Sequence, residues 1–111
     1  EPTKRSKETT EKEREKMMLK YDEDKYLDEV KKYILSTYSQ HYVGQEDQVQ
    51  VLDLLESVGI VEEHIRASCI KYASRYGKKG GRNKDDLLKL AHYAILLLYF
   101  TDKKNLDIAS K

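Results

Sequence analysis

Three basic residues, Lys71, Arg75 and Lys78, recur at spacings of four and three residues. On a continuous helix these side chains share one face, and His64 lies one seven-residue step back along the same face. Clustered cations of this kind bind anions, phosphate above all, through charge-assisted hydrogen bonds. The spacing therefore predicts an anion-binding surface on a helix that covers these residues.

The segment that follows Lys78 has the composition of a phosphate-binding turn. Lys79 and Arg82 flank the glycines at 80–81, and Asn83 then caps the next predicted helix. Glycines allow the backbone to approach a ligand closely, and the first amides of a helix attract anions. The segment lacks the spacing of a P-loop. The alternative is that basic residues at a helix end only complement the helix dipole.

Tyrosine is unusually frequent, with nine residues against one phenylalanine and no tryptophan. Tyr42, Tyr72 and Tyr93 fall beside the basic segment or within its helices. Aromatic rings next to cations are typical of a surface on which a nucleotide base stacks. The alternative interpretation is that Tyr72 and Tyr76 belong to the core, with their hydroxyls at its edge.

The histidines and the single cysteine do not form a metal-binding pattern. His41, His64 and His92 are far apart, and Cys69 has no second cysteine with which to share a zinc ion. We therefore predict no metal site, and the sequence identifies no cofactor. His41 lies beside Tyr42 in a predicted loop, where it could act as a general base.

Hydrophobic periodicity predicts an all-α fold, a compact bundle of about four helices. The four helices are expected at residues 24–38, 48–57, 61–76 and 83–100, with a loop at 39–47. For the last helix we predict an inner face that contains Leu87, Leu90, Ala91, Ala94, Ile95 and Leu98. Every residue from 94 to 100 is apolar, so this end should be buried on all sides, and a second subunit is the simplest cover.

Charge is divided unevenly along the chain, although the net charge is only +1. Residues 21–63 carry eleven acidic and three basic side chains, whereas residues 71–89 carry seven basic and two acidic ones. The two segments either complement each other within or between subunits, or the basic segment receives an external anion. The near-zero total argues against broad, nonspecific nucleic-acid binding.

Composition sets the remaining expectations. The length of 111 residues allows one domain, which we predict at 21–111. Residues 1–20 should form a charged flexible arm. The alternative is an exposed helix that begins at the capping box of Thr10 and Glu13. Because charged residues make up 37% of the chain, the core is small and we expect a homo-oligomer. No segment resembles a membrane span or a signal peptide, so we predict a cytoplasmic protein.

The order of the motifs resembles a family of small bacteriophage proteins described as SaV-like or nucleotide-kinase-like. The resemblance covers about residues 40–101 and rests on His41-Tyr42, on the segment from Ile70 to Gly81, and on the later Asp86, Lys89 and Tyr93. One branch of that family contains a nucleoside monophosphate kinase without a P-loop, so the resemblance implies phage origin, the host cytoplasm, oligomeric assembly and a nucleotide ligand. Carried over by position, it implicates the following residues: His41, Tyr42, Lys71, Tyr72, Arg75, Lys78, Lys79, Asp86, Lys89 and Tyr93.

Two functions follow as hypotheses. In the first, a nucleotide or other phosphate-bearing ligand is held by the basic residues, including Arg82 and Lys89, with the tyrosines against its base. Any kinase-like chemistry would then use His41 or Asp86 to handle the proton. In the second, the basic segment of a non-enzymatic module docks an acidic protein, its own subunits or nucleic acid.

Overall fold

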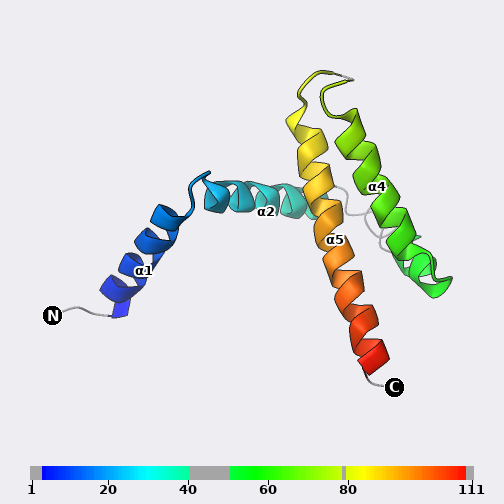
Figure 1. The fold of residues 1–111 in the computed structure, drawn as a ribbon, viewed down its shortest axis with the longest axis horizontal. Coiled ribbons are helices and arrows are strands. Elements are labelled where there is room, and N and C mark those ends of the chain that lie inside the picture. The colour runs from blue at the N-terminus through cyan, green and yellow to red at the C-terminus, as the bar shows by residue number, and fades with distance from the viewer. Residues whose placement is uncertain (1–3, 41–50, 79, 110–111) are drawn as a thin grey trace. The chain divides into compact units, whose positions relative to one another are not determined.

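The computed structural model describes residues 4–40, 51–78 and 80–109. Within these ranges the chain forms helices and turns, with no strand. The helices are α1 (Lys4–Met18), α2 (Glu23–Gln40), α4 (Val61–Arg75) and α5 (Lys84–Ala109), and residues 51–57 are also helical (Figure 1). The all-α prediction is therefore confirmed.

The described residues group into two units, Glu1–Lys32 and Tyr33–Lys111, with the boundary inside α2. In the first unit, α1 occupies the segment for which we preferred a frayed arm. This helix matches the alternative interpretation but begins at Lys4, before Thr10. The side chains from Thr10 to Met18 are exposed, so burial does not stabilise this helix. The high helix propensity of its Lys, Glu and Arg residues favours it instead. The division of the chain at residue 20 stays a prediction.

In the second unit, α4 and α5 form an antiparallel hairpin (Figure 1). The turn between them follows the sequence closely. Gly77 and Gly81 adopt positive φ angles of 84° and 72°, and the amide of Gly77 donates to the carbonyl of Gly81 at 2.8 Å. The Asn83 side chain accepts a hydrogen bond from the Asp85 amide at 3.0 Å, which confirms the predicted cap of α5.

The hydrophobic core lies at the other end of the hairpin and is small. Val61, Ile65 and Phe100 are its buried apolar residues among those described. Partly buried apolar groups surround them: Leu52, Leu55, Cys69, Tyr93, Leu96 and Leu97. The predicted face of α4, with Val61, Ile65 and Cys69 in one stripe, is therefore the face that packs.

The sequence prediction for α5 is wrong in two respects. The helix continues to Ala109 instead of ending near residue 100, because residues 101–109 include no proline or glycine to stop it. The face toward the core carries Tyr93, Leu97 and Phe100, whereas Leu87, Ile95 and Leu98 from the predicted stripe are exposed. The end of α5 is therefore not covered on all sides within one chain. In the described part of the chain, no helix is both long and apolar enough to cross a membrane.

Candidate functional site

The basic face predicted from the sequence separates into two groups in the structure. Arg75 at the end of α4 is engaged with Asp86 in the first turn of α5, with 3.5 Å between Arg75 Nε and Asp86 Oδ1. Asp86 is only 1% exposed, whereas the Arg75 side chain is 42% exposed. This ion pair ties the two helices together next to the turn.

The Asp86 carboxylate is an incompletely satisfied buried group. The Oδ2 atom of this side chain has no hydrogen-bond partner among the described residues. The backbone amide of Asp86 donates to the Asn83 carbonyl at 3.1 Å. A buried carboxylate without full hydrogen bonding depends strongly on a paired cation such as Arg75. Asp86 therefore helps to hold α4 and α5 together. A direct catalytic role for Asp86 stays an untested prediction.

The second basic group comprises two lysines that approach the same tyrosine ring. Lys71 Nζ lies 5.2 Å and Lys89 Nζ 5.5 Å from the centroid of the Tyr72 ring. The Tyr72 ring in turn stacks with Tyr93 of α5, with 5.8 Å between centroids and 15° between planes. Both distances fall within the range of cation–π attraction, so the ring partly compensates the repulsion between the two ammonium groups.

A cavity of about 500 Å³ opens beside this cluster. The volume falls within the range of roughly 300–1,000 Å³ that is common for small-molecule sites. Ten described residues from α2, the helical segment 51–57, α4 and α5 line it, and none of them is acidic: Tyr33, Thr37, Val51, Leu52, His64, Tyr72, Lys89, His92, Tyr93 and Leu96. We call this space the tyrosine–lysine cavity.

Burial favours the neutral forms of three groups that line the tyrosine–lysine cavity, Tyr33, His92 and Tyr93. Burial lowers the pKa of His92 below its usual 6.5, so the imidazole is neutral at pH 7. Burial, followed by the nearby Asp85, Tyr72 and Tyr93, raises the pKa of Tyr33. Burial and then Tyr72 raise the pKa of Tyr93, which a hydrogen bond with the Ser68 side chain partly offsets. The walls therefore offer neutral donors and acceptors beside the lysine cation.

The neutral groups contact one another in a fixed arrangement. The Tyr33 and His92 rings meet edge to face, with 6.1 Å between centroids and 83° between planes. The Thr37 hydroxyl donates to the Ile34 carbonyl at 2.7 Å, which leaves its oxygen able to accept a hydrogen bond. The cavity thus presents aromatic surface, uncharged polar atoms and the Lys89 cation next to one another.

The other predicted site residues lie elsewhere. Lys78 and Arg82 are exposed in the turn between α4 and α5, and neither lines the tyrosine–lysine cavity. His41, Tyr42 and Lys79 lie outside the described residues. Of the predicted set, the structure thus brings together Lys71, Tyr72, Lys89 and Tyr93.

Sequence reasoning missed the contributions of Tyr33, Thr37 and His92 to the cavity. His92 was considered only as a metal ligand, although it follows Lys89 by three residues and therefore lies on the same side of α5. That spacing was the available signal. Tyr33 and Thr37, one helical turn apart on α2, gave no signal of their own, because their approach to α5 depends on tertiary packing.

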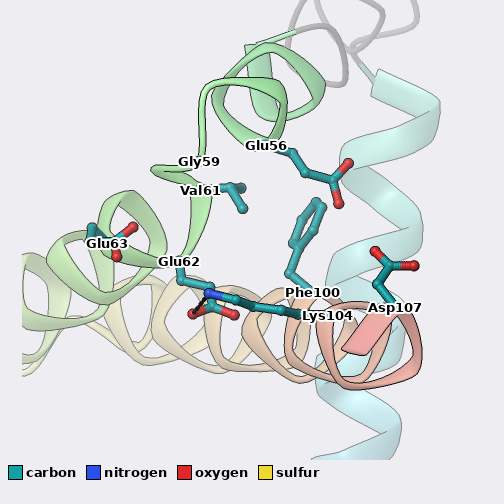
Figure 2. A pocket seen from close by; sticks show the side chains of 8 residues that line it. All are labelled: Glu56, Gly59, Val61, Glu62, Glu63, Phe100, Lys104 and Asp107. Atoms are coloured by element: carbon teal, nitrogen blue, oxygen red, sulfur yellow. Dashed lines mark ion pairs between the residues drawn. The ribbon is translucent and has the colours of Figure 1, made fainter. Parts of the chain in front are cut away.

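A second, smaller hollow of about 200 Å³ lies at the opposite end of the hairpin (Figure 2). Val61 and Phe100 lie there among the carboxylates of Glu56, Glu62 and Asp107. Lysines pair with two of these carboxylates, Lys103 with Glu56 at 2.9 Å and Lys104 with Glu62 at 3.9 Å. Nowhere in the described ranges do three or more acidic, histidine or cysteine side chains gather as metal ligands would.

Comparison with known proteins identifies a family but no function. No curated protein and no solved structure matches the chain. The family described as Protein of unknown function (DUF3310) matches residues 36–95, which include α4, the first twelve of the 26 residues of α5 and every residue that lines the tyrosine–lysine cavity except Tyr33 and Leu96. Since the match covers more than half of its length, the chain belongs to the DUF3310 family.

Proposed function

We propose that the tyrosine–lysine cavity binds a nucleotide or a closely related phosphate-bearing aromatic ligand. The observation that carries this proposal is the convergence of Lys71 and Lys89 on the Tyr72 ring, beside a cavity whose described lining includes no carboxylate. Two cations that share one ring repel each other. A phosphate near both of them removes that repulsion and accepts charge-assisted hydrogen bonds from each.

The rest of the cavity suits the nucleoside part of such a ligand. A base can lie against the rings of Tyr72 and Tyr93, and stacking on an aromatic side chain contributes about 1–3 kcal/mol per base. The neutral His92 imidazole and the hydroxyls of Tyr33 and Tyr93 can exchange hydrogen bonds with the edge of the base. A purely inorganic anion would leave this aromatic surface unused.

The kinase-like part of the proposal rests on the resemblance to the phage family and not on the cavity. In that form the chain is a P-loop-less nucleoside monophosphate kinase of a bacteriophage, acts in the host cytoplasm and forms a homo-oligomer. Of its two catalytic candidates, Asp86 is buried and paired with Arg75. Its carboxylate therefore stabilises the hairpin and could reach a substrate only if that ion pair opened. His41 carries the proton-handling role in this proposal.

A second candidate function is favoured by a different observation. Lys78 and Arg82 are exposed in the turn, away from the tyrosine–lysine cavity. In the alternative, this basic turn docks an acidic protein or a short nucleic acid without catalysis. The two candidates therefore use different residues, and variants can separate them.

A thermal-shift screen with nucleoside mono-, di- and triphosphates tests the first candidate. A ligand at one hundred times its dissociation constant stabilises the native state by about 2.7 kcal/mol, which is a readily measured shift. Lys89→Gln should weaken nucleotide binding by about tenfold or more, because a hydrogen bond to a charged group contributes roughly 1.5–3 kcal/mol. Arg82→Gln is the matched control and should leave nucleotide binding unchanged.

The outcomes distinguish the candidates. Nucleotide stabilisation that Lys89→Gln removes and Arg82→Gln retains supports the cavity proposal. Absence of any nucleotide shift, together with salt-sensitive binding to an acidic protein or nucleic acid that Arg82→Gln weakens, supports the docking function. Nucleotide binding that both variants leave intact refutes the assignment of the site.

A further inference from the structure

The face of α5 that points away from α4 is apolar and largely exposed among the residues that the structure describes. Leu87, Ala91, Ala94 and Leu98 follow one another at spacings of four, three and four, which places them in one line along the helix. Leu87 and Leu98 are exposed, Leu98 to 65%, and Ile95 beside them is exposed as well. A contiguous apolar stripe on a chain with so small a core marks an interaction surface.

The order of residues along this stripe is the same in both directions. A leucine stands at each end and the two alanines stand in the middle. If two copies of α5 cross antiparallel about a point between His92 and Tyr93, Leu87 of each faces Leu98 of the other, and Ala91 faces Ala94. Small residues at the centre allow the two helix backbones to approach closely, and the leucines pack at both ends.

The charges at the two ends of the hairpin favour the same antiparallel arrangement. The turn after α4 carries Lys78 and Arg82, whereas the opposite end carries Glu56, Glu62, Glu63 and Asp107, together with Lys104, around the smaller hollow (Figure 2). Two of those carboxylates pair with lysines of the same chain, and the segment 53–63 nevertheless has four acidic residues and no basic one. In this register the basic turn of each chain lies level with residues 103–107 of the other and far from the other chain's basic turn, so the two turns do not repel each other.

We propose that the stripe of Leu87, Ala91, Ala94 and Leu98 is a two-fold interface at which a second copy of this chain binds antiparallel. Such an interface is isologous, since the same patch serves both subunits, and it closes at two copies. A parallel arrangement would set the basic turns side by side, where their charges repel. This interface is independent of the tyrosine–lysine cavity, whose lining contains none of the four stripe residues.

Cross-linking through introduced thiols tests the register. In the full chain, the double variant Leu87→Cys/Leu98→Cys should give a covalent dimer with a short bifunctional thiol reagent. The single Leu87→Cys variant should not, because its two thiols lie eleven residues, or about 16 Å, apart in this register. The unmodified chain, which has only Cys69, provides the baseline. Efficient cross-linking of the single variant, or none of the double variant, overturns the proposal.

Mass measurement tests the interface itself. The unmodified chain should have twice the 13.0 kDa of one chain at micromolar concentration, and Leu98→Asp should weaken association at least a hundredfold. Ile70→Asp is the matched control, because Ile70 is also 65% exposed but lies on α4, and it should keep the dimer mass. A monomeric unmodified chain, or a dimer that Leu98→Asp leaves intact, overturns the proposal. Nucleotide stabilisation is read separately, so failure of one proposal is distinguishable from failure of the other.

Discussion

Removal of the Arg75 guanidinium should destabilise the hairpin through the buried carboxylate it faces. Arg75→Met keeps most of the aliphatic length of the side chain and deletes its charge. The Asp86 carboxylate would then remain at 1% exposure without the cation now 3.5 Å from its Oδ1 atom, while Oδ2 already lacks a partner among the described residues. An unpaired buried charge is a costly group in any fold.

The structure sets the size of this effect. Breaking a fully buried ion pair by removing one partner costs about 3–5 kcal/mol, whereas exposed pairs contribute roughly 0–1 kcal/mol. Because Arg75 is 42% exposed and Asp86 is buried, the cost should fall between these limits, at about 2 kcal/mol. In a domain of this size that corresponds to a decrease in melting temperature of about 10 °C.

A double-mutant cycle, measured by urea unfolding, isolates the contribution of the pair. Asp86→Asn keeps the shape of the side chain and removes its charge. In the Asp86→Asn background, Arg75→Met should cost less than about 1 kcal/mol, which leaves a coupling energy of about 1–2 kcal/mol. An equal cost of Arg75→Met in both backgrounds would show that Arg75 stabilises the hairpin through packing alone, and the electrostatic account would be refuted.

Three further predictions concern stability. Asn83→Ala should cost about 1 kcal/mol in thermal or urea unfolding, because the Asp85 amide loses its cap, and an unchanged midpoint would contradict the role of the cap. Gly77→Ala should cost about 1–2 kcal/mol in the same assay, because a φ of 84° disfavours a residue with a Cβ atom. No non-neighbouring atom lies within 4 Å of the place of that Cβ, so the cost comes from the backbone alone. A stabilised variant would show that the turn relaxes. Burial lowers the pKa of His92, so the unfolded chain binds a proton at this imidazole more readily than the folded chain does. The free energy of unfolding is therefore unaffected by this histidine above pH 6.5 and decreases as the pH falls below 6.5. Between pH 7 and 5.5 the melting temperature should fall less in His92→Gln than in the unmodified chain, and identical slopes would remove His92 as the cause.

Local signals in the sequence predicted both helices of the hairpin and the turn between them, but not the end or the packed face of α5. The apolar spacing of Val61, Ile65 and Cys69 gave the packed face of α4, and Gly77 and Asn83 gave the turn and the cap. The same periodicity misassigned the faces of α5, because apolar residues occur on both sides of that helix. Periodicity identifies an apolar stripe but not its partner, and on α5 the stripe with Leu98 points outward.

The candidate site was predictable only in part for a similar reason. Composition identified cations and tyrosines around residues 71–93, and four of the predicted residues do converge. The spacing of Lys71 and Arg75 implied a common role, yet Arg75 faces a buried acid on the neighbouring helix. Pairing across helices depends on the register of the hairpin, which no pattern within one helix reports.

The most direct test of the tyrosine–lysine cavity is an NMR titration of the chain with ring-labelled tyrosine. The chain has nine tyrosines, of which Tyr33, Tyr72 and Tyr93 line the cavity, whereas Tyr21 and Tyr26 belong to the other unit. Addition of a nucleoside monophosphate should shift the ring signals of the three cavity tyrosines in a saturable way and leave those of Tyr21 and Tyr26 in place. Saturating nucleotide that leaves the cavity tyrosines unmoved, or that shifts all tyrosines alike, would contradict the proposed site.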